Sequence, residues 1–216
     1  MTSPTNQDSG SEHDEKTVNR KRNLKPILVK IGLDMIPVIG GILIALFINS
    51  LQENRRDQQL LASTLASLSD EFSKNKESIE KILPRQQLFL DSLRFFSENE
   101  SYSIADIGTK TKGIVLSELH STNWRTSLNN NSLRLLNFEA INLLSRIDAK
   151  REELKDQEAF INPTVFGPPF FKKGKEGMEY RKGMELWMAG LIGNETELLE
   201  LYREFEELLQ NKRYQR

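Results

Sequence analysis

The sequence predicts an all-α protein, in which one N-terminal transmembrane helix continues into a membrane-anchored helical bundle with a long first helix. Two observations predict this fold class. Residues 35–51, MIPVIGGILIALFINSL, carry no charged side chain. After them, apolar residues recur at intervals of three and four along most of the chain, which is the pattern of helices that bury one face.

The apolar stretch predicts a membrane span, assigned to residues 26–51. As a helix, residues 35–51 would measure about 26 Å, near the lower limit for crossing a bilayer. A buried core helix is the alternative, but such a helix usually keeps a polar stripe, and only Asn49 and Ser50 interrupt this one. An interfacial helix is disfavoured, because it needs a charged face and residues 35–51 have none. The run also lacks the small-residue cleavage site of a signal peptide, so we expect a retained anchor.

Composition limits what the rest can be. With 216 residues, the chain has room for the anchor and one modest domain. It has no cysteine and two histidines, which excludes disulfides and thiolate chemistry and leaves little for metal binding. The net charge of −1 gives no general attraction to nucleic acid.

The segment before the span is polar and basic. Residues 1–25 should form a disordered cytoplasmic tail, because they have too little apolar surface to offset the entropy of ordering. Residues 16–30 carry basic but no acidic side chains, whereas residues 52–59 mix both signs. This bias predicts a cytoplasmic N-terminus and an extracytoplasmic domain at 52–216. The basic cluster would also attract anionic lipid headgroups. Binding of nucleic acid is the weaker alternative for this cluster, because it lies against the span.

One face of the span carries small residues. Gly41, Ala45 and Asn49 follow one another at intervals of four, so two helix backbones could approach closely along that face, and the asparagine could form a hydrogen bond across it. These three residues are the candidate helix–helix interface. The alternative is that glycine is simply common in membrane helices.

Beyond the span the helical pattern continues without a break in period. It predicts a long seam that faces either a second copy in a coiled coil or, as we favour, other helices of the same chain. Pro84 lies inside this seam and predicts a kink or break near Leu83. The seam residues are Leu61, Leu65, Leu68, Phe72, Asn75, Ile79, Ile82, Gln86, Phe89, Leu93 and Phe96.

Two connectors and four further helices are expected after the seam. Residues 97–113 read as a connector with a capping box at Ser103 and Asp106, followed by a helix from about Thr111. Ser132 is expected to cap a helix whose apolar stripe is Leu133, Leu136, Ala140, Leu143, Ile147 and Leu154.

The C-terminal third begins with a loop rich in proline and glycine. Residues 162–177 are expected to be non-helical, with Phe166, Phe170 and Phe171 folding back on the bundle. The following helix is expected to break near Gly193. Asn194 would then cap a closing helix that turns Leu198, Tyr202, Phe205 and Leu209 inward.

No pattern indicates catalysis. His120 has acidic and hydroxyl neighbours, but neighbours in sequence do not form a triad, so a structural histidine is expected. The carboxylates at Glu152, Glu153 and Asp156 and along residues 195–207 are most simply solvated helix faces. We therefore expect no catalytic, cofactor or metal site, and no enzyme.

The join between the span and the next helix, VIGGILIALFINSLQENRRDQQLLASTLASLSDEF, resembles a family of small bacterial membrane proteins catalogued as domain of unknown function six thousand and ninety. The shared phrase is G-I-L-I-A-L-x-I-N at residues 41–49, followed by Glu53, Arg55 and Arg56. A looser similarity covers residues 123–136. The resemblance implies a Gram-negative inner-membrane protein with a periplasmic helical domain, and it implies no activity.

These observations leave two functional hypotheses. The first is a non-enzymatic single-pass protein whose helical domain binds a protein partner or a second copy of itself, with the lipid bilayer as its other partner. The alternative is a domain that senses a small ligand between its helices and acts through a partner protein, because the short cytoplasmic tail holds no output domain.

Overall fold

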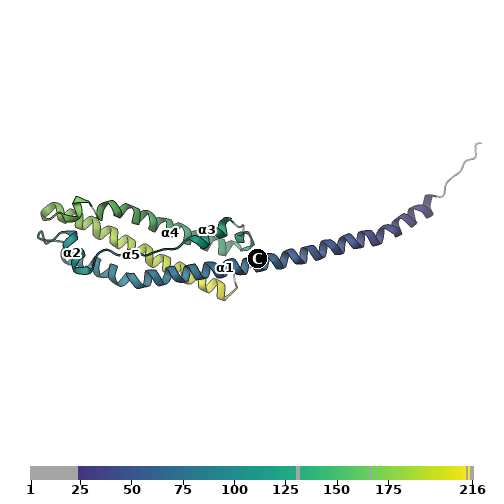
Figure 1. The fold of residues 1–216 in the computed structure, drawn as a ribbon, viewed down its shortest axis with the longest axis horizontal. Coiled ribbons are helices and arrows are strands. Elements are labelled where there is room, and N and C mark those ends of the chain that lie inside the picture. Colours follow the sequence, from purple (N-terminus) through teal and green to yellow (C-terminus); the bar gives the residue numbers. More distant parts are fainter. Residues whose placement is uncertain (1–23, 130–131, 166, 213, 215–216) are drawn as a thin grey trace, which may run out of the picture. The chain divides into compact units, whose positions relative to one another are not determined.

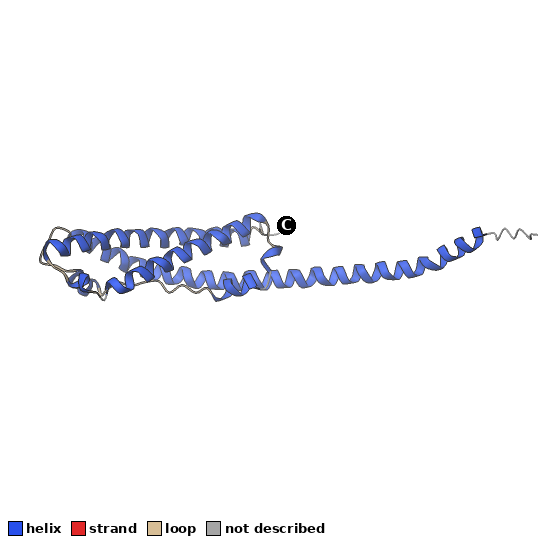
Figure 2. Cartoon of the chain, turned by 90° about the horizontal axis from the view of Figure 1, so that it is seen from above, coloured by secondary structure: helices blue, strands red, loops and turns tan. Residues whose placement is uncertain are grey.

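The computed structural model describes residues 24–129, 132–165, 167–212 and 214. Within these residues the chain forms five α-helices and two short 3-10 helices, and no strand (Figure 1, Figure 2). The predicted all-α fold class is therefore confirmed. Contacts divide the chain into two compact units, Met1–Gln52 and Glu53–Arg216.

Helix α1, Leu24–Phe95, begins in the first unit. The predicted disordered tail lies outside the described residues except for Leu24 and Lys25, which are helical. Pro26 suits a helix start because its missing N–H would have no partner in the first turn.

The apolar part of α1 is long and apolar enough to cross a membrane. Its large side chains are exposed rather than packed against protein, although burial is the normal fate of such residues in water. These exposed residues are Met35, Ile36, Val38, Ile39, Ile42, Leu43, Ile44, Leu46, Phe47, Ile48 and Leu51.

The seam of α1 is buried within the second unit, as predicted. Ten of its eleven residues are buried and Phe96 packs against the core. The seam faces helices of its own chain: Phe72 stacks on Tyr202, with ring centroids 4.9 Å apart, and meets the edge of Phe205 at 5.0 Å. The intrachain bundle is therefore confirmed for this face.

Of the kink or break predicted near Leu83, the break is wrong, because α1 continues through Pro84 to Phe95, and the kink stays a prediction. Proline removes one backbone donor and crowds the preceding turn, at a cost of about 3 kcal/mol in an isolated helix. Here the turns on both sides are fixed by buried side chains, including Ile82 and Gln86. Tertiary packing therefore outweighs the local preference of proline.

Helix α2, Ile104–Thr111, has the capping box predicted at Ser103 and Asp106. The helix predicted from Thr111 is wrong. Lys112 and Gly113 both have positive φ, 64° and 85°, a conformation that ends a helix. Residues 113–121 then run without regular secondary structure.

Helix α3, Thr122–Asn129, and a 3-10 helix, Ser132–Leu135, precede α4, Phe138–Val165. Ser132 is therefore not the cap of the long helix. That role belongs to Asn137, whose Oδ1 accepts a hydrogen bond from the Ala140 backbone N–H at 2.9 Å. The predicted stripe is confirmed, since Leu136, Ala140, Leu143, Ile147 and Leu154 are buried and Leu133 packs against the core.

The proline-rich loop is shorter than predicted. Helix α4 extends to Val165, a 3-10 helix covers Pro168–Phe171, and α5 begins at Gly174 and ends at Gln210. Phe170 packs against the core, whereas Phe171 is exposed, contrary to expectation. Phe166 lies outside the described residues.

The predicted break at Gly193 is also wrong, because α5 is continuous there. Asn194 lies inside the helix and donates a hydrogen bond to Glu153 of α4 at 3.0 Å instead of capping a new one. Leu198, Tyr202 and Phe205 are buried as predicted. Helices α4 and α5 lie side by side along the second part of α1 in both views (Figure 1, Figure 2).

Candidate functional site

The extended segment 113–121 is fastened to α1 by side chains that bind its backbone. Asn75 donates from Nδ2 to the His120 carbonyl at 2.9 Å and accepts from the His120 N–H at 2.7 Å. Gln86 donates to the Val115 carbonyl at 3.1 Å. The two polar interruptions of the seam therefore supply hydrogen bonds to a segment that has neither helix nor sheet partners.

Arg151 of α4 continues this network. Its guanidinium donates to the His120 carbonyl and, at 3.4 Å, to Glu71 of α1. The other oxygen of Glu71 accepts from the Asn123 N–H at 2.6 Å, at the start of α3. Both charged side chains are almost fully buried. Such a pair costs desolvation energy but fixes the relative positions of the elements it joins.

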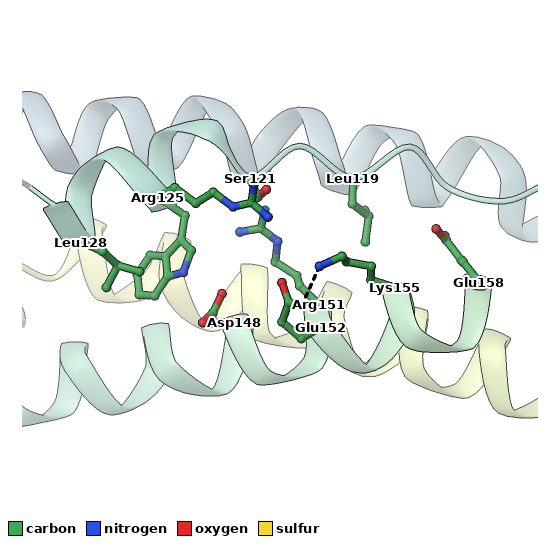
Figure 3. Close-up of a pocket in the computed structure, with 10 residues that line it drawn as sticks. Leu119, Ser121, Arg125, Leu128, Asp148, Arg151, Glu152, Lys155 and Glu158 are labelled. Carbon is green, nitrogen blue, oxygen red and sulfur yellow. Dashed lines mark hydrogen bonds and ion pairs between the residues drawn. The ribbon is translucent and has the colours of Figure 1, made fainter. Parts of the chain in front are cut away.

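Directly over Arg151 lies a cleft of about 270 Å³, enclosed by α4, α3 and the end of the extended segment (Figure 3). Its apolar walls come from Leu119, Leu128 and Trp124. Charged side chains of both signs complete it (Figure 3). The charged lining residues are Arg125, Asp148, Arg151, Glu152, Lys155 and Glu158.

Some of these groups are already paired. Lys155 donates to Glu152 at 2.9 Å, and Arg151 is held by Glu71. Among the described residues, the side chains of Arg125 and Asp148 form no hydrogen bond or close ion pair, although the charge of Arg125 acts on the Glu152 carboxylate. The indole Nε1 of Trp124 is buried without an acceptor. The cleft therefore presents one cation and one anion whose side chains form no hydrogen bond, and one unpaired N–H group.

Two carboxyl groups that repel each other lie beside this network: Glu158, which is partly exposed and lines the cleft, and Glu195, which is not among the lining residues. Glu195 of α5 is completely buried, and its Oε1 accepts from Ser117 at 2.6 Å and from Gln86 at 3.2 Å. Burial raises the pKa of Glu195. Burial, followed by repulsion from Glu195, raises the pKa of Glu158 to about 7. Glu158 therefore exchanges a proton near neutral pH.

The site residues predicted from sequence lie elsewhere. Gly41, Ala45 and Asn49 are exposed along α1, and a Cβ added to Gly41 would meet no atom within 4 Å. Their role as an interface stays a prediction. The side chain of His120 is exposed while its backbone is bound, in agreement with a structural role.

The interpretation of the carboxylates as solvated was wrong for Glu195. The signal was present in the sequence, because Glu195 shares the inward stripe of α5 with Leu191, Leu198 and Tyr202. Arg151 occupies the same kind of inward position on α4. The cleft itself could not be predicted, since it depends on where residues 113–121 cross the helices.

Comparisons with protein-family models, curated proteins and solved structures gave no match. The fold and the site define a class, an all-α protein that has one candidate membrane-spanning helix among its described residues and a helical unit with a small polar cleft.

Proposed function

We propose that this chain is a single-pass protein of a bacterial inner membrane, with its N-terminus in the cytoplasm and residues 52–216 in the periplasm. The observation that supports the anchor is the exposure of every large apolar side chain from Met35 to Ile48. A helix without a polar face is stable in lipid, where its backbone is satisfied internally. The basic residues before it support the orientation.

The proposed role of the helical unit is binding, without catalysis, of a protein partner or a second copy. The buried polar groups support a structural use, because Asn75, Gln86 and Arg151 bind main-chain carbonyls. The resemblance of residues 41–49 to the uncharacterised membrane family supports the compartment. Membership of that family is part of the proposal.

The absence of cysteine from the sequence makes the topology directly testable. Thr5→Cys and Lys175→Cys would each introduce one thiol, in the tail and in α5. A membrane-impermeant maleimide should label intact spheroplasts of the Lys175→Cys variant, whereas the Thr5→Cys variant should be labelled only after lysis. Recovery of the full chain in the supernatant after detergent-free lysis and ultracentrifugation would refute the anchor itself.

Self-association is tested by crosslinking in native membranes. Gly41→Leu would place a large side chain on the small-residue face and should reduce dimer yield, because close backbone approach would be blocked. Gly40→Leu is the matched control, since it adds the same side chain about 100° around the helix. Equal crosslinking in wild type and both variants would remove this face as an interface.

A second candidate function is the sensing of a small ligand, which the cleft favours. It combines apolar walls with a few polar groups that lack partners, as ligand sites commonly do. Because no described part of the chain is an output domain, a signal would pass through a partner protein. A metabolite screen by thermal shift on the full chain tests this function, since a ligand of the folded state raises the melting temperature.

A further inference from the structure

The free groups of the cleft specify a ligand chemistry. Trp124 Nε1 is a buried donor without an acceptor, in a side chain that is only 6% exposed. A buried donor of this kind destabilises the fold unless an acceptor reaches it. The cleft that Trp124 lines is the space from which such an acceptor could come.

The free cation defines the acceptor. Arg125 lines the same cleft, and among the described residues its guanidinium forms no hydrogen bond or close ion pair, although its charge acts on Glu152. A guanidinium presents a planar fork of donors that matches the two oxygens of a carboxylate. Arg125 and the indole N–H together therefore favour a carboxylate over a neutral carbonyl.

The free anion defines a second group on the same ligand. Asp148 also lines the cleft without a side-chain partner among the described residues, and an ionised carboxylate only accepts hydrogen bonds. An ammonium group supplies both the charge and the donors. Three basic and three acidic side chains line the cleft, which disfavours a multiply charged anion such as a nucleotide.

We propose that the cleft binds a small zwitterion of the amino-acid class, with its carboxylate on Arg125 and Trp124 Nε1 and its ammonium group on Asp148. The apolar walls at Leu119 and Leu128 then face the ligand side chain. A cleft of about 270 Å³ suits one amino acid rather than a larger metabolite. This inference rests on the second candidate function, small-ligand sensing.

The test uses the full chain in detergent micelles and follows the melting temperature with each of the common amino acids. Phenylalanine has two matched probes, 3-phenylpropanoate, which lacks the ammonium group, and phenethylamine, which lacks the carboxylate. The expected result is a rise in melting temperature with at least one amino acid and a much smaller rise with its single-charge analogues. An equal rise with either analogue would overturn the zwitterion assignment.

Variants locate the binding groups. Arg125→Gln and Asp148→Asn should each weaken binding about tenfold or more, because each removes a charged hydrogen-bond partner. Trp124→Phe keeps an aromatic ring, removes the N–H and should also weaken binding. Asp148→Asn should weaken the binding of the amino acid but not the binding of 3-phenylpropanoate. General destabilisation of the fold would not produce that difference. Unliganded melting curves establish that each variant folds.

The matched controls are Arg146→Gln and Asp156→Asn on α4, which remove the same charges from exposed positions outside the cleft. They should bind as wild type does, and an equal loss in them would overturn the assigned site. If another class of metabolite raises the melting temperature and Trp124→Phe abolishes the effect, sensing stands and the zwitterion is wrong. If no compound raises the melting temperature, both the sensing function and the zwitterion assignment fail. The membrane anchor is tested separately, by ultracentrifugation.

Discussion

Replacing Asn75 by leucine separates two interpretations of the α1 seam. If the asparagine merely interrupts a hydrophobic seam, Asn75→Leu should stabilise the protein by completing it. If the asparagine holds the extended segment, the same change should destabilise it. The structure supports the second outcome, because the fully buried side chain joins His120 on the segment to Tyr202 on α5.

The size of the destabilisation follows from the hydrogen-bonding groups that lose Asn75 as a partner. The His120 carbonyl keeps Arg151 as a donor, so the His120 N–H and the Tyr202 hydroxyl lose a partner. Each unpaired group costs about 1–3 kcal/mol, while burying leucine returns about 1.5 kcal/mol. We expect the free energy of unfolding to fall by about 0.5–4.5 kcal/mol.

The assay is urea unfolding of the full chain in detergent, followed by circular dichroism, together with hydrogen exchange of residues 113–121. Loss of the hydrogen bond from His120 should accelerate exchange in that segment first. Asn54→Leu, at an exposed position of α1, is the matched control and should change stability little. An Asn75→Leu variant at least as stable as wild type, with unchanged exchange, would refute the reasoning.

Three further predictions concern the same helical unit. The pKa of Glu158 is raised from 4.5 to about 7. Protonation of Glu158 therefore favours the folded state, and the free energy of unfolding should fall as pH rises through that range. Because solvent screens this partly exposed group, Glu158→Gln should reduce that fall by only about 1 kcal/mol, measured by urea unfolding at several pH values. Arg181 is buried and donates to the Ser97, Asn99 and Tyr102 carbonyls, so Arg181→Met should lower the unfolding free energy by about 3 kcal/mol in the same assay, whereas an unchanged midpoint would contradict the role. A Cβ at Gly177 would overlap the Lys172 carbonyl, so Gly177→Ala should lower the melting temperature, whereas Gly183→Ala, which meets no atom within 4 Å, should not.

Helix faces were predictable from the sequence, and helix ends were less so. The seam of α1 and the stripe of α4 follow from the spacing of apolar residues, because burial of one face imposes that spacing. The breaks expected at Pro84 and Gly193 are local preferences, and neighbouring buried residues on α1 and α5 override them. The capping box at Ser103 succeeded because both of its hydrogen bonds are local.

The cleft depends on contacts between residues far apart in the chain. Nothing near Val115 or His120 in sequence indicates that Gln86 and Asn75 bind their backbones. The apolar spacing after Thr111 predicts a helix, because the local sequence gives no sign of these long-range hydrogen bonds. Buried acids and bases on inward stripes, such as Glu195 and Arg181, are the signal that sequence analysis could have used.

The fastening of residues 113–121 through main-chain atoms has a consequence for evolution. Val115, Glu118 and His120 are each bound through a main-chain carbonyl or amide group. The identity of the side chain at these positions therefore matters little to the hydrogen bonds. Substitutions should accumulate at these positions, whereas Asn75 and Gln86, whose side chains form the hydrogen bonds, should be conserved. Distant relatives would then share an irregularly spaced pair of amides on a long helix rather than any continuous motif.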